Sequence, residues 1–108
     1  AAGAKLVLVM GHTSCGAVMG ACDHVQLGNL TGLLDRIQPA VEAVRNVPGD
    51  RNSKNTKFVE AVSEMNVRLT VARIRELSPI LRDLEKTGKI QIVGCIYDLG
   101  TGRVQFLQ

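Results

Sequence analysis

The chain has 108 residues, enough for one domain with one hydrophobic core and too few for a second. Hydrophobic residues make up 45% and aromatic residues only 3%, a globular composition with an aliphatic core that suits an α/β fold. The net charge is +3, but the basic residues are spread from Lys5 to Arg103 without clustered aromatic side chains, which argues against a nucleic-acid partner. The longest apolar run is about five residues, so we expect no membrane span and no membrane partner.

The first predicted element is a strand over residues 5–10. Its continuous aliphatic character is typical of a strand buried on both faces of a parallel sheet. Small residues then predict a helix that runs to about Asp23, with Ser14 as its N-cap. The strand and the helix therefore meet at a short glycine-flanked turn, residues 11–16.

An amphipathic pattern follows a break at residues 27–29 and predicts a helix that starts at Asn29 or Thr31. Its apolar positions are Leu30, Leu33, Leu34, Ile37, Val41 and Val44. Pro39 inside this pattern predicts a kink or a join between two helices, because proline lacks the backbone donor. Residues 47–55 are polar and contain a Pro-Gly-Asp sequence, which predicts a solvated loop.

The next predicted element is a long helix over residues 56–77. The apolar stripe of this helix is expected to comprise Val59, Val62, Met65, Leu69, Ala72, Ile74 and Leu77. Ser78 and Pro79 then predict the N-cap and the first residue of another helix, which Gly88 ends. The buried side of that helix is expected to comprise Ile80, Leu81 and Leu84.

Two strands are predicted at the end of the chain, over residues 89–96 and 103–107, with a turn at residues 98–102. They are expected to form a hairpin. The whole pattern predicts a single domain over residues 1–108, with a mainly parallel β-sheet flanked by helices and a C-terminal hairpin.

The turn at residues 11–16 has the spacing G-x-x-x-x-G of a P-loop. However, Ala17 and Val18 stand where a P-loop has Lys and Ser or Thr, so the groups that meet phosphate and magnesium are missing. A cysteine phosphatase would need an arginine within the next turn or two to hold phosphate, and residues 16–21 contain none. Neither phosphate chemistry fits the turn.

A zinc site explains more of this turn. Imidazole and thiolate are preferred zinc ligands, and His12 and Cys15 lie where a strand ends and a helix begins, which would aim both at one point above the sheet edge. The alternative for an isolated H-x-x-C is structural: His12 bonds within the loop and Cys15 is a small buried residue.

The other candidate ligands are less suitable. Cys22 lies two helical turns beyond Cys15, about 10 Å along the axis, which is too far for a shared metal. Cys95 lies in an apolar strand and is expected in the core, whereas Asp23 and Asp98 suit a helix end and a turn. Three cysteines in all favour reduced thiols over a disulfide framework. A further ligand must come from outside this stretch of sequence.

Two segments resemble the β-class carbonic anhydrases. Residues 6–18, LVLVMGHTSCGAV, resemble the second zinc-binding segment of that family, and residues 92–106, IVGCIYDLGTGRVQF, resemble its closing hairpin. The pair Asn66-Val67 also fits the family pattern. The resemblance covers essentially all 108 residues and implies that His12 and Cys15 are zinc ligands, with no such role for Cys22 or Cys95.

The family's first motif, C-x-D-x-R, is absent from the 108 residues. In the family this motif supplies the third zinc ligand and an Asp-Arg pair, so we assign no catalytic residue within this chain. We therefore expect a C-terminal portion of a β-carbonic-anhydrase-like domain that is inactive by itself. We also expect surfaces normally covered by the absent portion to promote non-native association.

The resemblance implies a Zn²⁺ enzyme that converts carbon dioxide reversibly to bicarbonate, using water whose pKa the metal lowers toward 7. It also implies a homodimer or a higher homo-oligomer. Two other functions stay open: a non-catalytic scaffold or binding domain, and a carbonyl sulfide or carbon disulfide hydrolase on the same scaffold. The chain begins without Met or a leader, and we expect a cytoplasmic protein, or a periplasmic one if a leader has been removed.

Overall fold

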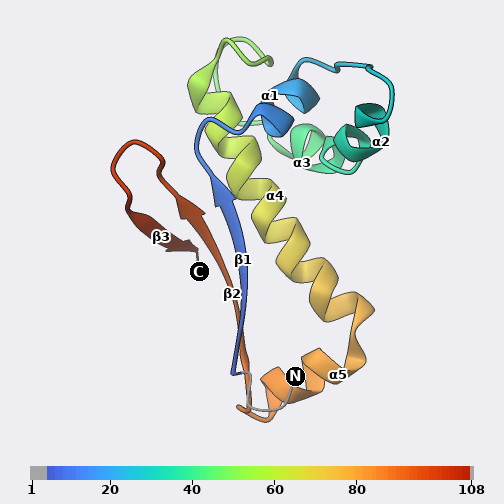
Figure 1. Cartoon of the computed structure of the whole chain (residues 1–108), viewed down its shortest axis with the longest axis vertical. Coiled ribbons are helices and arrows are strands. Elements are labelled where there is room, and N and C mark those ends of the chain that lie inside the picture. Colours follow the sequence, from blue (N-terminus) through green and yellow to red (C-terminus); the bar gives the residue numbers. More distant parts are fainter. Residues whose placement is uncertain (1–4, 108) are drawn as a thin grey trace.

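The computed structural model describes residues 5–107 as a cluster of short helices and a three-stranded sheet, both packed along one long helix (Figure 1). The helices are α1 (Gly16–Cys22), α2 (Leu30–Asp35), α3 (Gln38–Ala43), α4 (Thr56–Leu77) and α5 (Pro79–Lys86), and the strands are β1 (Leu6–His12), β2 (Gln91–Tyr97) and β3 (Val104–Leu107). The predicted α/β class is confirmed. None of these helices combines the length and the hydropathy needed to cross a bilayer.

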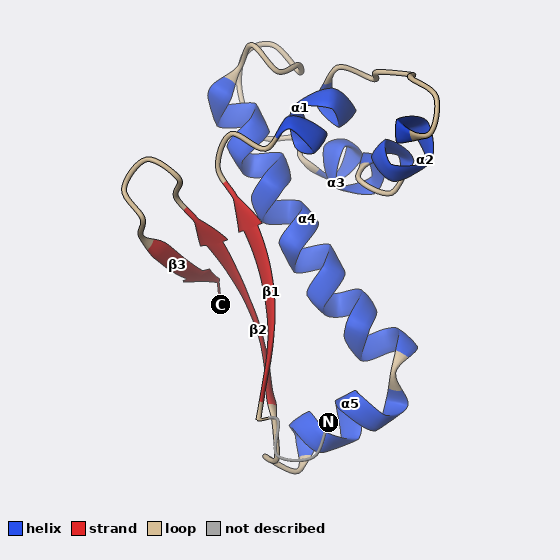
Figure 2. Cartoon of the chain, viewed as in Figure 1, coloured by secondary structure: helices blue, strands red, loops and turns tan. Residues whose placement is uncertain are grey.

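The sheet has the order β1-β2-β3 (Figure 2). Strands β1 and β2 pair in parallel over seven positions, from Leu6 opposite Gln91 to His12 opposite Tyr97. Strands β2 and β3 pair antiparallel over four positions, so the predicted C-terminal hairpin is confirmed. Asp98 stabilises its turn because the carboxylate accepts hydrogen bonds from the amides of Gly100 and Thr101, at 2.8 and 3.3 Å.

Helix α4 has the predicted bounds and organises the molecule. It begins after Asn55, whose side chain accepts a hydrogen bond from the Phe58 amide, and it ends before Ser78. Its first half packs against the short helices, in a buried cluster of Val18, Ala21, Cys22, Leu34, Ile37, Ala40, Val41, Val44, Phe58, Val59 and Val62. Its second half packs against the sheet, in a cluster of Val67, Val71, Ile90 and Ile92. One helix therefore links two separate cores.

The approach of α4 to the sheet is closest at Val67. A Cβ atom added to Gly94 would lie 2.7 Å from Val67 Cγ1, and one added to Gly11 would lie 2.9 Å from Val67 Cγ2. Real Cβ atoms do not approach so closely, and the two glycines therefore form the notch that receives this side chain. Gly11 directly precedes His12. The packing of Val67 against this glycine therefore fixes the position of the end of β1 relative to α4.

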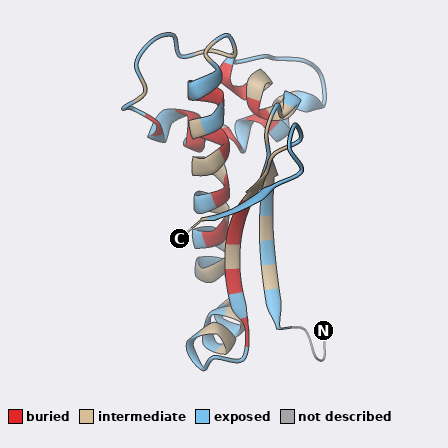
Figure 3. Ribbon diagram, turned by 90° about the vertical axis from the view of Figure 1, so that its left-hand side faces the viewer, coloured by how far each residue is buried: buried red, intermediate tan, exposed pale blue. Residues whose placement is uncertain are grey.

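The predicted burial of β1 on both faces is wrong for the described residues. Residues 6, 8, 10 and 12 are exposed, whereas 7, 9 and 11 are half-buried (Figure 3). The inward row faces α4, and no helix within residues 5–107 packs on the outward row. An alternating strand can carry an apolar side chain at every position and still be covered on one side alone.

Four helical positions also depart from expectation. Leu69, Ala72 and Leu77 of α4 are exposed, Leu77 by 73%, and Ile80 of α5 is 74% exposed. Val67 and Val71 form the buried stripe in their place. The helical period was right, but the sheet covers only a narrow stripe of α4.

The predicted helix boundaries are mostly confirmed. Ser78 caps α5 by accepting a hydrogen bond from the Leu81 amide at 3.2 Å, with Pro79 at the start of the helix. Pro39 lies at the start of α3, so it marks a join between two helices. The predicted Ser14 cap is wrong, because Cys15 is the N-cap residue of α1 and no side chain caps this helix.

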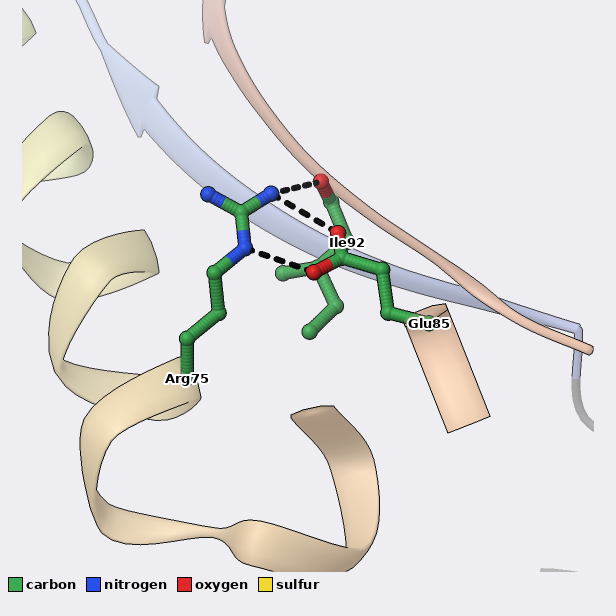
Figure 4. Close-up of polar contacts among 3 residues, drawn as sticks. All are labelled: Arg75, Glu85 and Ile92. Carbon is green, nitrogen blue, oxygen red and sulfur yellow. Dashed lines mark hydrogen bonds and ion pairs between the residues drawn. The ribbon is translucent and has the colours of Figure 1, made fainter. Parts of the chain in front are cut away.

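Arg75 ties the far end of α4 to α5 and β2 (Figure 4). Its guanidinium makes a bidentate pair with Glu85, with both N···O distances at 2.8 Å, and donates to the Ile92 carbonyl at 3.2 Å. The Arg75 side chain holds the pKa of Glu85 below its usual range. Ile92 lies before the β2 residues that pair with β3, so the arginine satisfies a carbonyl that the ladder leaves free.

Candidate functional site

The candidate site begins at the carboxyl end of β1. His12 is the last residue of this strand, whereas the sequence predicted it within the turn that follows the strand. The next residue, Thr13, fastens the strand end to the hairpin: its amide donates to the Tyr97 carbonyl at 3.0 Å, and its hydroxyl accepts from the Leu99 amide at 3.0 Å. These two bonds hold the histidine at a defined place on the sheet edge.

The imidazole of His12 is oriented by the backbone. Its Nδ1 atom lies 2.8 Å from the Thr13 carbonyl oxygen. A carbonyl oxygen only accepts, so Nδ1 carries the proton in this contact and Nε2 keeps its lone pair when the ring is neutral. The ring thus offers Nε2 to a ligand, an arrangement typical of metal-binding histidines.

Cys15 reaches the site through a tight turn. Ser14 has a φ of 55°, in the left-handed region that L-residues rarely adopt, and this reverses the chain between the strand and α1. The thiol at the N-cap position is half-buried. Ser14 cannot serve as the cap because it makes the turn that places Cys15 there.

His12 and Cys15 line one cavity of about 370 Å³ between β1, α1 and α4. Its other lining residues are Val9, Met10, Gly11, Val18, Ile37, Ser63, Asn66, Val67 and Thr70. Cys22, Cys95 and His24 are not among them. The predicted pair is therefore brought to a common cavity, and Cys22 and Cys95, which the sequence had made less suitable as ligands, lie elsewhere.

The polar residues contributed by α4 were not predicted as part of the site. Ser63, Asn66 and Thr70 lie three and four positions apart, on one face of the helix, and all three line the cavity. The Thr70 hydroxyl donates to the Asn66 carbonyl at 2.7 Å. The sequence signal for these residues was three polar side chains at helical spacing beside the apolar stripe of the helix. Only Asn66 had been noted, for its fit to the family pattern.

The donor set suits zinc but is incomplete. An imidazole nitrogen and a thiolate sulfur are the donors that zinc prefers, and both face the same cavity. Within residues 5–107 no group of three or more His, Cys, Asp or Glu side chains is placed to hold a metal ion. The described residues therefore supply two donors, and a zinc centre needs at least one more protein ligand.

Cys22 is a buried thiol without a ligand role. Burial, with a smaller contribution from Asp23, raises its pKa to about 11. Such a thiol stays protonated at neutral pH, and a protonated thiol is a poor metal ligand. Cys95 is also fully buried, as predicted, but it lies outside both hydrophobic clusters, in register between Met10 and Phe106.

The fold defined by this sheet and helix arrangement is that of the β-carbonic anhydrases. The chain superposes on the β-carbonic anhydrase CafA of Aspergillus fumigatus with a TM-score of 0.75 and 26% identity, over 96% of this chain and 49% of that one. A tetrameric β-carbonic anhydrase from Sordaria macrospora gives a TM-score of 0.75 at 20% identity, over 95% of this chain and 52% of that one.

The sequence comparisons agree with the fold. The family model described as carbonic anhydrase matches residues 1–104, and the chain belongs to this family. It is 31% identical to "Carbonic anhydrase 2" of Mycobacterium tuberculosis over 91% of this chain and 46% of that protein. It is 30% identical to "Carbonic anhydrase" of Mycolicibacterium smegmatis over 93% of this chain and 48% of that protein. The chain spans about half the length of these relatives.

Proposed function

We propose that this chain is the C-terminal portion of a zinc-dependent enzyme that hydrates carbon dioxide reversibly to bicarbonate. His12 and Cys15 are two of the zinc ligands in this proposal. The observation that carries it is their common cavity at the end of β1, in a chain of the carbonic anhydrase family. The pair would be unremarkable alone, but here the fold, the family and the donor chemistry all favour the same metal.

In this proposal five of the residues that line the cavity have separate roles. His12 presents Nε2 because its Nδ1 is engaged by the Thr13 carbonyl, and Cys15 presents Sγ from the start of α1. Zinc bound by these donors would lower the pKa of water toward 7 and so supply a nucleophile at neutral pH. Val9, Val18 and Ile37 give the cavity an apolar wall, which suits a small apolar substrate such as carbon dioxide.

The missing protein ligand is assigned to the C-x-D-x-R segment of the family, which the 108 residues do not contain. Strand β1 is an edge strand of the described sheet, so its free side can pair with a strand that brings this segment beside His12. The β-carbonic anhydrases of Sordaria macrospora are described as tetrameric, and we propose a homo-oligomer for the intact protein.

Metal binding by the chain itself tests the ligand assignment. We expect the metal-free chain to take up zinc in competition with a chromophoric chelator. His12→Ala and Cys15→Ser should each weaken zinc by more than about 100-fold, beyond the effect of losing an outer-shell partner. His24→Ala is the matched control, because His24 is exposed and lies outside the cavity, and it should leave the affinity unchanged. Equal affinities in all four proteins would overturn the assignment.

Activity is measured on the protein extended at its amino terminus by the C-x-D-x-R segment. Stopped-flow hydration of carbon dioxide that depends on His12 and Cys15 would support the proposed reaction. Stoichiometric zinc without turnover would instead favour a non-catalytic scaffold, and turnover confined to carbonyl sulfide or carbon disulfide would favour a hydrolase.

A further inference from the structure

We propose that the C-terminal hairpin sets the orientation of the His12 ring, and with it the affinity for zinc, through the side chain of Thr13. Thr13 is a positioning residue, because it acts on the metal site through His12. This role rests on the proposed function, in which His12 is a zinc ligand. It makes the amide of Leu99, which lies 86 positions from Thr13 in the sequence, a determinant of the metal site.

Thr13 contacts the hairpin on one side and the imidazole on the other. Its amide donates to the Tyr97 carbonyl at 3.0 Å and continues the parallel pairing of β1 with β2 by one residue. Its hydroxyl accepts from the Leu99 amide at 3.0 Å. Its carbonyl oxygen lies 2.8 Å from Nδ1 of His12. A continuous series of hydrogen bonds therefore runs from the hairpin to the ring.

The two bonds to the hairpin fix the direction of the Thr13 carbonyl. The first bond holds the amide of Thr13, and the second holds its side chain, whose branched Cβ atom leaves few χ1 rotamers. Ser14 follows with a φ of 55°, so the peptide group between Thr13 and Ser14 turns away from the strand direction. The carbonyl that meets Nδ1 of His12 belongs to this peptide group. Loss of the bond to the hairpin would therefore move the acceptor that orients the ring.

The Leu99 amide belongs to a turn with several internal hydrogen bonds. Asp98, the residue before Leu99, donates its amide to the Arg103 carbonyl, and its carbonyl accepts from the Gly102 amide, both at 2.8 Å. The Asp98 carboxylate also accepts from two amides of the turn. These bonds hold the Leu99 amide in place, so it can serve as a fixed partner for Thr13.

The Thr13 side chain lies outside the metal cavity. It lines a separate cavity of about 850 Å³ between the hairpin and the first half of α4. The described residues that line the cavity of His12 and Cys15 do not include Thr13. A substitution of Thr13 therefore leaves the side chains of the metal cavity unchanged, and its effect on zinc must pass through the His12 ring. Partners of this kind typically contribute about 10–100-fold to metal affinity.

Zinc affinity of the chain, measured in competition with a chromophoric chelator, tests the link. Thr13→Val keeps the branched shape and removes the acceptor, so it should weaken zinc by about 10–100-fold. Thr13→Ser keeps the hydroxyl and should restore the parental affinity. Leu99→Pro removes the donor of the same bond, at a turn position where proline is common, and should weaken zinc as Thr13→Val does.

A double variant and a matched control separate this link from a general effect on the hairpin. Thr13→Val combined with Leu99→Pro should bind zinc no more weakly than either single variant, because both substitutions break one bond. Thr101→Val is the control. The Thr101 hydroxyl accepts from the Arg103 amide at 3.2 Å within the same turn, so its loss should leave zinc affinity unchanged.

The tautomer of the His12 ring gives a second readout in the metal-free chain. Nitrogen NMR of the neutral imidazole distinguishes a proton on Nδ1 from one on Nε2. We expect mainly the Nδ1–H form in the parent and in Thr13→Ser, because the hydrogen bond of one ring nitrogen decides which nitrogen carries the proton. Thr13→Val and Leu99→Pro should increase the Nε2–H form. A loss of stability alone would leave the tautomer of the folded chain unchanged.

The outcomes distinguish this inference from the proposed function. Parental zinc affinity in Thr13→Val, with binding that depends on His12, would overturn the positioning role and leave the ligand assignment standing. Zinc binding that does not depend on His12 would overturn the ligand assignment, and the tautomer would then decide whether Thr13 orients the ring. A parental tautomer in both Thr13→Val and Leu99→Pro would overturn the link in either case.

Discussion

Gly94 shows how one missing side chain sets the distance between two elements. The absence of a Cβ lets β2 approach Val67 of α4, and Gly11 does the same for β1 one residue before His12. A side chain at either position must displace Val67, because the nearest atoms belong to a buried and branched residue.

We expect Gly94→Ala to lower the free energy of unfolding by about 1–3 kcal/mol, as overpacking does in other cores. Urea unfolding followed by circular dichroism measures the effect. Gly32→Ala is the control, since Gly32 lies in α2 with no atom within 4 Å of an added Cβ. That change should stabilise by about 0.5–1 kcal/mol because alanine favours a helix. A Gly94→Ala chain as stable as the parent would contradict the close packing.

Individual residues differ in how well the sequence could place them. His12 and Cys15 could be singled out as candidate ligands because their chemistry and spacing are local. Ser78 was a correct cap because the following proline leaves few alternatives. The prediction of Ser14 as the N-cap was wrong. The chain reverses direction at Ser14, which requires a left-handed backbone conformation, and the preference of serine for N-cap positions carries no information about this reversal.

At the scale of elements, Asp23 joins the end of α1 to the loop over residues 45–55. Its carboxylate accepts from the Ser53 amide at 2.7 Å and from the Ser53 hydroxyl at 2.5 Å. Both contacts hold the pKa of Asp23 below its usual value. The contact with the Ser53 hydroxyl contributes most, and the contact with the Ser53 amide contributes less. Arg51 anchors the same loop by donating to the carbonyls of Val41 and Val44 at the end of α3.

The Asp23 contact predicts a loss of stability in acid. The folded-state pKa is depressed, so the contribution is present above the unfolded value of about 4 and is lost as the pH falls through the folded pKa. Ser53→Ala should move the pKa of Asp23 upward, which carboxyl NMR titration measures. Asp23→Asn should flatten the pH dependence of stability below pH of about 4. Asp50→Asn, in the same loop, is the control, and an unchanged Asp23 pKa in Ser53→Ala would count against the contact.

The elements themselves were predicted more closely than their burial. Helix α4 has the expected bounds because Asn55 and the Ser78-Pro79 pair are strong boundary signals. The exposure of Leu69 and Leu77 was not predictable, because helical spacing gives the apolar side of a helix but not the width or length of the surface that covers it.

At the scale of the whole molecule, helix α4 covers one side of the sheet, and no helix within residues 5–107 covers the other. Val9 packs against the hydrophobic cluster between α4 and the sheet. Its neighbour Leu8 lies on the opposite face of β1 and is exposed within the described part of the chain. Side chains at adjacent positions of β1 therefore contribute differently to the free energy of unfolding.

We expect Val9→Thr to destabilise the metal-free chain by about 1–3 kcal/mol, because it places a hydroxyl in an apolar contact. Leu8→Thr should change stability by no more than about 0.5 kcal/mol, since Leu8 is an exposed residue on the outward row, where no helix within residues 5–107 packs on it, and threonine suits a strand. Thermal unfolding at low protein concentration compares the two. Equal losses would show that the outward row of β1 is covered in solution.

The sequence by itself determined the local features of this protein: the α/β order of its elements, the final hairpin and the placing of His12 and Cys15 around the turn between β1 and α1. These follow from periodicity and turn chemistry, which act over a few neighbouring residues. Only the tertiary structure decided that α4 serves two cores, that Ser63, Asn66 and Thr70 share the cavity of His12, and that no helix of the described part of the chain covers the outward face of β1. Such relations join residues far apart along the chain, so they depend on which surfaces meet when the molecule packs.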